Sequence, residues 1–143
     1  MTTLRELLNK KGGDVHFARP DDTVLDAIQQ MADRNIGALM VLDGDKPVGI
    51  FTERLYAREV FLKGRGSPNT KISEVMERQV CYADLSQSVD ECMAVMTDKK
   101  VRHLPVMDGG KLVGIVSIGD LVKNKIADQE FAIDQLEQYI RTS

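Results

Sequence analysis

The sequence predicts a mixed α/β (α+β) fold made of two tandem half-domains, each ordered strand-helix-strand-strand-helix. The main observation is an internal repeat, because residues 15–60 align with residues 80–125 without a gap at a constant offset of 65 residues. Identical pairs such as Met31/Met96 accompany apolar-to-apolar matches, which is typical of repeated supersecondary units. We expect two like units to pack with pseudo-two-fold symmetry, so that a cleft between them comes in two related copies.

The hydrophobic pattern places the elements of the first half in order. Residues 1–14 form an N-terminal helical segment, because three leucines recur at helical spacing. Thr23 is placed to cap the next helix, with Asp26 three residues later as a variant of the capping box. The first half-domain, residues 15–62, is expected to contain a strand at 15–18, a helix from 23, strands at 36–42 and 47–51 joined by a turn at 43–45, and a helix from 52 or 53 to about 62.

The second half repeats this order after a connecting segment. Residues 63–79 form a linker by their glycine and proline content, with a short helical piece near its end. Ser88 and Glu91 again have the spacing of a capping box. The second half-domain, residues 80–128, is expected to contain a strand at 80–83, a helix at 88–99, strands at 104–107 and 112–116 joined by a turn at 108–110, and a helix from about 118. Residues 129–143 form an amphipathic C-terminal helix whose apolar face needs a partner.

Composition argues against several classes of function. A net charge of −3, 5% aromatic residues and no tryptophan disfavour nucleic-acid binding. Cys81 and Cys92 lack the spacing of metal ligands, and the two histidines complete no zinc set. Cys92 lies on an apolar helix stripe, so we expect a reduced, buried thiol. No apolar run approaches membrane-spanning length, and we expect a cytoplasmic protein without a nucleic-acid or membrane partner.

Two short motifs in the second half carry a family resemblance. The segment Gly-Ile-Val-Ser-Ile-Gly-Asp at residues 114–120, with His-Leu-Pro-Val at residues 103–106, resembles the CBS domain, named after cystathionine β-synthase. Two such domains in tandem resemble a Bateman module, and the match extends from residue 4 to residue 140. Residues 49–58 and 128–131 are similar to stand-alone two-domain proteins of bacteria and plant organelles, which carry no catalytic domain.

The resemblance implies two clefts that hold adenosine-containing ligands such as AMP, ATP, NAD or S-adenosylmethionine. In the family motif [ST]-x-x-D, which Ser117 and Asp120 match, the hydroxyl faces phosphate and the carboxylate takes the ribose hydroxyls. From the residues themselves, Ser117 opens a helix whose N-terminus favours anions, and Gly114 would let a ligand approach the backbone. The alternative interpretations are that Ser117 only caps the helix and that Asp120 only complements its dipole.

The two predicted clefts differ at their polar positions. Leu55 stands where the first copy needs the ribose-binding acid, and a leucine cannot accept hydrogen bonds. The resemblance implies that Arg102 and His103 line this cleft, while their small counterparts, together with His16, wall the cleft that keeps Asp120. The candidate cofactor-binding residues, with no catalytic and no metal-binding residue among them, are Ser117, Asp120, Gly114, His16, Phe17, Ile36, Gly37, Ala38, Thr52, Arg54, Arg102 and His103.

The preferred function is a regulatory ligand-sensing module rather than an enzyme. No catalytic triad, carboxylate pair, metal cluster or Walker loop is visible in the sequence. The expected ligand is an adenine nucleotide bound as a regulatory ligand and not as a prosthetic group. The expected partners are a second copy in a homodimer, because of apolar surface on the tail, and an unidentified protein that senses the ligand. A structural or interaction module with decayed sites is the alternative, and a weak nucleotide-hydrolysing enzyme is a third hypothesis.

Overall fold

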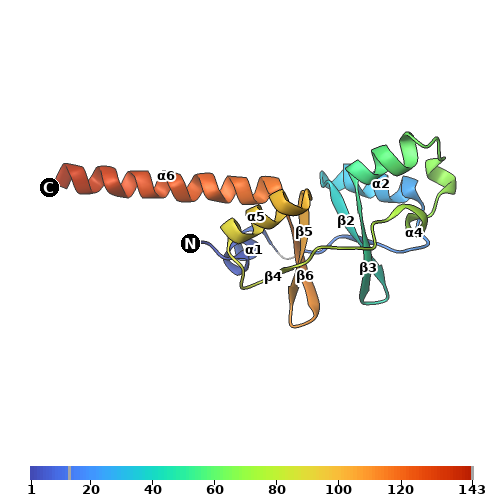
Figure 1. Cartoon of the computed structure of the whole chain (residues 1–143), viewed down its shortest axis with the longest axis horizontal. Helices are drawn as coiled ribbons and strands as arrows, with labels where there is room; N and C mark the ends of the chain where they lie inside the picture. Colours follow the sequence, from blue (N-terminus) through green and yellow to red (C-terminus); the bar gives the residue numbers. More distant parts are fainter. Residues whose placement is uncertain (13, 143) are drawn as a thin grey trace. The chain divides into compact units, whose positions relative to one another are not determined.

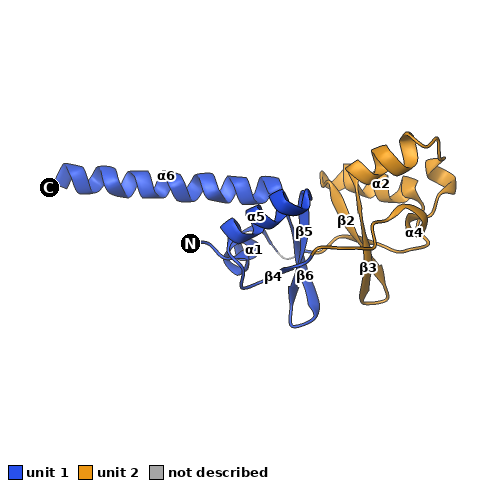
Figure 2. Ribbon diagram, in the orientation of Figure 1, with its two compact units in different colours: residues 1–14, 82–143 blue, residues 15–81 orange. Residues whose placement is uncertain are grey.

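The computed structural model describes residues 1–12 and 14–142. Gly13, in the predicted N-terminal segment, and Ser143, at the end of the predicted tail helix, lie outside the described residues. The chain forms two compact units, one of residues 1–14 and 82–143 and one of residues 15–81 (Figures 1 and 2). Each unit contains a three-stranded sheet with helices, so the predicted mixed α/β fold of two tandem half-domains is confirmed.

The unit of residues 15–81 contains the first sequence repeat. Its strand β1 runs parallel to β2, and β2 runs antiparallel to β3. Thr23 caps α2, because its hydroxyl accepts a hydrogen bond from the Asp26 N–H at 3.1 Å. In chain order the elements are β1 Phe17–Ala18, α2 Val24–Arg34, β2 Ala38–Asp43, β3 Lys46–Thr52, α3 Glu53–Leu55, the π-helix η1 Tyr56–Phe61, the 3₁₀ helix η2 Ser67–Asn69 and α4 Ile72–Val75.

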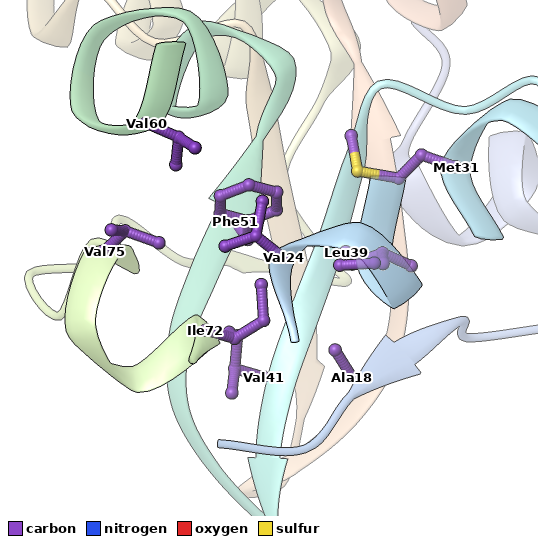
Figure 3. Packing of buried hydrophobic residues seen from close by; sticks show 10 residues of the cluster. Ala18, Val24, Met31, Leu39, Val41, Phe51, Val60, Ile72 and Val75 are labelled. Carbon is purple, nitrogen blue, oxygen red and sulfur yellow. The ribbon is translucent and has the colours of Figure 1, made fainter. Parts of the chain in front are cut away.

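The core of this unit lies between the sheet and its helices. Figure 3 shows Phe51 of β3 close to Val24 of α2, with Val60 of η1 and Val75 of α4 around them. The linker therefore contributes α4 to the core instead of running free over the surface. The buried residues of the cluster are Ala18, Val24, Ala27, Met31, Leu39, Val41, Phe51, Val60, Ile72 and Val75.

The predicted helix from residue 52 or 53 to about 62 differs from an ordinary α-helix. Only α3 is α-helical, and the chain then widens into the π-helix η1. Hydrogen bonds from Leu62 N–H to Ala57 O (3.0 Å) and from Arg65 N–H to Val60 O (2.9 Å) span five residues each. Apolar spacing alone does not distinguish this wider turn from a regular one, so the sequence could not predict it.

The second unit contains the second sequence repeat and the same sheet topology. Strand β4 is parallel to β5, and β5 is antiparallel to β6. The predicted capping box at α5 is complete, with Ser88 and Glu91 each bonded to the other's backbone N–H. In chain order the elements are α1 Leu4–Lys11, β4 Ala83–Asp84, α5 Val89–Lys99, β5 His103–Asp108, β6 Lys111–Ser117 and α6 Ile118–Thr142.

Helix α6 is one continuous element of 25 residues. We expected a second half-domain ending at 128 and a separate tail helix from 129, but the described helix passes through this point without a break. It is anchored to its own unit by Leu121, which is fully buried, and by a hydrogen bond from Thr2 Oγ1 to Asp128 Oδ2 at 2.8 Å. Within the described chain, no helix has both the length and the apolar character needed to cross a membrane.

Each unit is completed by a short segment that precedes the other repeat in the sequence. Residues 2–8 pack with the second repeat, where Val89 N–H donates to Thr2 O at 2.9 Å. Residues 70–76 pack with the first repeat, where Val24 N–H donates to Thr70 O at 2.8 Å. The segments that we expected to be a separate N-terminal helix and a linker are therefore equivalent parts of the two units.

Candidate functional site

The end of β6 and the start of α6 are joined by a reciprocal pair of hydrogen bonds. The Ser117 N–H donates to Asp120 Oδ2 at 2.9 Å, and the Asp120 N–H donates to Ser117 Oγ at 3.1 Å. This is the geometry of a capping box, which satisfies N–H groups that the first turn of a helix leaves free. The capping role considered from the sequence is present, and it fixes both side chains at the positive end of the longest helix.

Lys11, the last residue of α1, brings a cation to this pair. Its ammonium donates to Asp120 Oδ2 at 2.5 Å and to the Ile115 carbonyl at 2.9 Å. In the other unit, the carbonyl of Ile50, the repeat counterpart of Ile115, accepts instead from the Glu77 backbone N–H at 2.9 Å. The Lys11 side chain thus donates to the strand carbonyl that a backbone N–H satisfies in the other unit. It also adds a positive charge beside Asp120.

The environment of Asp120 keeps its side chain ionised at neutral pH. Partial burial of the carboxyl raises its pKa, but the hydrogen bond from Lys11, the Ser117 N–H and the charge of Lys11 lower it more, so the pKa lies below its ordinary value of 3.8. The side chain keeps 27% of its surface accessible. An anionic acceptor that solvent can reach therefore stands at the start of α6.

Two further candidate residues lie at the same end of this sheet. His103 opens β5 and is the register partner of Ser117 on β6. The carbonyl of Arg102 accepts a hydrogen bond from the Ile118 N–H at 2.9 Å, which ties the start of β5 to the first residue of α6. The structure therefore brings Arg102, His103, Ser117 and Asp120 together within one unit, with Arg102 exposed and His103 half-buried.

The corresponding place in the other unit has the same backbone and a different side chain. Thr52 Oγ1 accepts from the Leu55 N–H at 3.1 Å, and the Glu53 N–H donates to Gly37 O at 3.1 Å. Ala38 is the register partner of Thr52. Leu55 is half-buried and packs against the core of its unit. The helix start is thus conserved between the repeats in geometry, but an apolar contact replaces the carboxylate.

The remaining candidates of the first repeat lie around this sheet. Ile36 is partly buried against the core, and His16 precedes β1. Phe17 is 39% exposed, and the Arg19 guanidinium carbon lies 4.8 Å from the centroid of its ring. Arg54 is exposed in the short helix α3. These side chains offer an aromatic face and cations within the unit of residues 15–81.

Gly114 has a different neighbour from the one that its sequence suggested. We assigned the space at its missing Cβ to a ligand, whereas a Cβ there would lie 3.0 Å from Leu8 Cδ2. In the other unit, a Cβ on Gly49 would lie 2.7 Å from Met76 Sδ and 2.9 Å from the Glu77 carbonyl oxygen. Both glycines therefore admit the segment that completes each unit, and α1 packs where we expected a ligand to approach.

Repeated units of this topology, each with a capped helix after its hairpin, define a tandem-domain protein. The family model described as "CBS domain" matches residues 4–60 and again residues 72–126. The chain therefore belongs to the CBS-domain family and carries a tandem pair of these domains. The predicted resemblance is confirmed in this respect.

Individual relatives agree with this assignment. The chain is 34% identical over 149 residues to the mitochondrial CBS domain-containing protein CBSX3 of Arabidopsis thaliana, covering 98% of this chain and 72% of the relative. It is 52% identical, with a TM-score of 0.86, to a solved protein with CBS domains from Burkholderia ambifaria MC40-6, covering 90% of this chain and 96% of that one. The CBS domain pair of protein MJ0100, solved with 5′-methylthioadenosine and S-adenosyl-L-methionine, shares the fold with a TM-score of 0.78 and 24% identity over 90% of this chain and 98% of that one.

Lys11 is the residue of this site that the sequence interpretation missed. The repeat alignment began at residue 15, so α1 was left outside it. A second alignment, of residues 2–8 with residues 70–76, pairs Thr2 with Thr70 and Glu6 with Glu74. That match would have placed α1 in the unit of the second repeat. It does not indicate that the Lys11 side chain reaches Asp120, which is a tertiary contact.

Proposed function

We propose that this CBS pair is a regulatory ligand-sensing module that binds an adenosine-containing nucleotide through Ser117 and Asp120. The observation that carries the proposal is the ionised Asp120 carboxylate, held by the Ser117 N–H and the Lys11 ammonium at the start of α6. A carboxylate at such a place can accept two hydrogen bonds from a ribose diol, as an acidic residue does in dinucleotide-binding folds. The ligand would be AMP, ATP, NAD or S-adenosylmethionine.

The site has both the acceptor and the cation that a nucleotide requires. The two hydrogen bonds described for Asp120 both reach Oδ2, whereas an ionised carboxylate accepts about four. The N-terminus of α6 favours phosphate because its N–H groups and its dipole present positive potential. Lys11 would then face the bound anion as well as Asp120, and we add it to the proposed ligand contacts.

The other half-domain would supply the remaining contacts. The CBS pair of MJ0100, which shares the fold, was solved with two adenosine compounds, and this supports the ligand class. In this proposal, ligand binding changes the conformation of the module, and a partner protein recognises that change. The chain itself catalyses no reaction. The residues proposed beside Ser117, Asp120 and Lys11 are His16, Phe17, Ile36, Gly37 and Ala38. The other candidates, Thr52, Arg54, Arg102 and His103, are proposed for the second cleft, where Leu55 replaces the acid.

We also propose that the chain acts as a homodimer. Exposed apolar side chains along α6 support it, among them Ile133 (54% exposed) and Leu136 (61% exposed). Large apolar side chains in such a row on one element are typical of a surface that a partner covers.

A structural or interaction module is the second candidate function. Leu55 favours it, because this half-buried side chain packs against the core of its unit and stands in the place of the ribose-binding acid. In that case the Ser117–Asp120 pair would be a capping box with an ion pair and no ligand. The two candidates differ in one measurable property, the stabilisation of the protein by adenosine compounds.

A thermal-shift experiment separates them. We expect AMP, ATP, NAD or S-adenosylmethionine to raise Tm, with inorganic phosphate as a control, because saturation to 100 times Kd contributes about 2.7 kcal/mol. Asp120→Asn keeps the shape of the cap and should reduce the shift, whereas Asp98→Asn changes an exposed acid of α5 and should not. Absence of a shift with all four compounds would favour the structural module. If the ligands raised the Tm of the wild type and of Asp120→Asn equally, the binding site would not include Asp120.

A further inference from the structure

The exposed surface of α6 carries a heptad pattern that the repeat does not explain. Six residues, five of them apolar, follow one another at alternating steps of four and three. Isoleucine occupies every position a, and the d positions are less uniform. The six residues of this seam are Val122, Ile126, Gln129, Ile133, Leu136 and Ile140. Isoleucine at a with leucine at d is the pattern that favours two-stranded parallel coiled coils.

The apolar side chains of this seam are exposed in the part of the chain that the structure describes. Every residue from 126 to 142 is exposed, and the five apolar members of the seam are between 39% and 71% exposed. Figure 2 shows α6 extending beyond α5 and the sheet of its unit. A helical segment of this length is only marginally stable in water unless an amphipathic face is packed, so the outer half of α6 needs a partner.

The polar member of the seam identifies that partner as a second copy of the same helix. In a parallel, in-register pair, Gln129 of one chain meets Gln129 of the other, and the two amides can donate to and accept from each other. In an antiparallel pair centred on the seam, Gln129 would face Ile133 and leave its amide unpaired among apolar side chains. One polar layer in an otherwise apolar seam is a known device for fixing register and strand number.

The flanking charges point to the same arrangement. In the parallel register, Lys125 at position g approaches Glu130 at position e of the second copy, which is an attractive pair repeated twice by symmetry. In the antiparallel register, Glu130 would meet Glu130 of the second copy, which is repulsive. Lys125 already binds Asp90 at 2.9 Å within its own chain, and an ammonium with three N–H donors can hold both carboxylates.

We infer that α6 pairs with α6 of a second copy as a parallel, in-register, two-stranded coiled coil with a Gln129 layer. The interface begins at Val122, where α6 still packs on its own unit, and continues to Ile140, over about 27 Å of helix. This inference deepens the proposed homodimer by naming the surface and the register, and it is independent of nucleotide binding.

Disulfide crosslinking of the full chain tests the register. In a Cys81→Ser background, with Cys92 left buried, Leu136→Cys places a thiol in a d layer, and Gln138→Cys places one on the opposite side of the helix. Mild oxidation should give a covalent dimer in at least tenfold higher yield for Leu136→Cys than for Gln138→Cys. In the antiparallel arrangement position 136 faces position 126, about 15 Å from its own copy, so only a mixture of the Leu136→Cys and Ile126→Cys proteins would crosslink.

Sedimentation of the same proteins under reducing conditions keeps the two proposals distinguishable. A particle of twice the chain mass together with crosslinking at position 136 supports the coiled coil. A particle of twice the chain mass without selective crosslinking at position 136 overturns the coiled coil and leaves the homodimer standing. A monomer overturns both, and crosslinking only in the mixed sample overturns the parallel register.

Discussion

Lys11 and Asp120 form an ion pair of 2.5 Å that joins the end of α1 to the start of α6. The same ammonium binds the Ile115 carbonyl, so one side chain fixes a helix end, a strand edge and the candidate site. A bound ribose would have to share Asp120 with this cation. The ion pair therefore links the stability of the unit to the occupancy of the site, and both effects can be measured.

Replacing Lys11 with methionine should reduce stability in a pH-dependent way. The folded pKa of Asp120 lies below its ordinary value of 3.8, so the contribution of the carboxylate is present above that pH and is lost as the pH falls through the folded pKa. At pH 7 we expect a loss of about 1 kcal/mol or less, because the lysine is 41% exposed and solvent screens the pair. Urea unfolding from pH 7 down through the folded pKa gives the free energies of unfolding.

Lys10→Met is the matched control, since Lys10 is exposed on the same helix and α1 keeps its length. It should lose less stability than Lys11→Met at pH 7. If the difference between Lys11→Met and the wild type persisted unchanged at the lowest pH, the ion pair with Asp120 would not be its source.

The two repeat glycines should differ in their tolerance of alanine. At Gly49 the added Cβ would lie 2.9 Å from the Glu77 carbonyl oxygen, which Ile50 holds by a backbone hydrogen bond. At Gly114 its nearest contacts are the terminal methyl groups of Leu8, which can rotate away. We expect Gly49→Ala to cost about 2–3 kcal/mol and Gly114→Ala about 1 kcal/mol in denaturant unfolding. The reverse order would contradict this account of the packing.

The two cysteines should react at very different rates. Burial, with a smaller contribution from the charge of Glu91, raises the pKa of Cys92 to about 11, while Cys81 is half-buried. Because the thiolate is the reactive form, Cys81 should react with a disulfide reagent at pH 8 and Cys92 only after unfolding. A thiol titration of the native Cys81→Ser protein should give no fast phase, and a fast phase there would show that Cys92 is accessible.

The sequence predicted most of the architecture because the repeat and the apolar periodicity are local signals. Strands, capping residues and both helices that follow them could be read from spacing alone. The π-helix η1 could not be predicted from spacing, because Val60 is buried there as it would be in an ordinary α-helix. The packing of α1 on the second repeat was also missed, because only the separate match of residues 2–8 with residues 70–76 indicates it.

The capping geometry at the candidate site was predicted from the sequence, whereas the residues that surround it were not. Ser117 and Asp120 were identified because they match the family motif, and the three-residue spacing of that motif also explains their capping geometry. Leu8 beside Gly114 and Lys11 beside Asp120 depend on tertiary contacts across more than 100 residues, and no local pattern encodes them.

Leu55→Asp should create ribose binding in the first repeat if the repeats differ only by that carboxylate. Because Leu55 packs on the core of its unit, this substitution should also lower the free energy of unfolding by about 1–2 kcal/mol. Leu55→Asn is the control, because it has the same size without the charge. In a nucleotide titration, the stoichiometry should rise from one site per chain in the wild type to two in Leu55→Asp, and it should stay at one in Leu55→Asn. A stoichiometry of one in both variants would contradict the proposed asymmetry.

The central claim is that Asp120 holds an adenosine nucleotide, and calorimetric titration of the full chain tests it most directly. The account predicts one tight site per chain for at least one of AMP, ATP, NAD and S-adenosylmethionine. Losing a charge-assisted hydrogen bond costs about 1.5–3 kcal/mol, so Asp120→Ala should bind the same ligand roughly 10- to 100-fold more weakly. Equal affinity in the wild type and Asp120→Ala, or two equally tight sites in the wild type, would contradict the account.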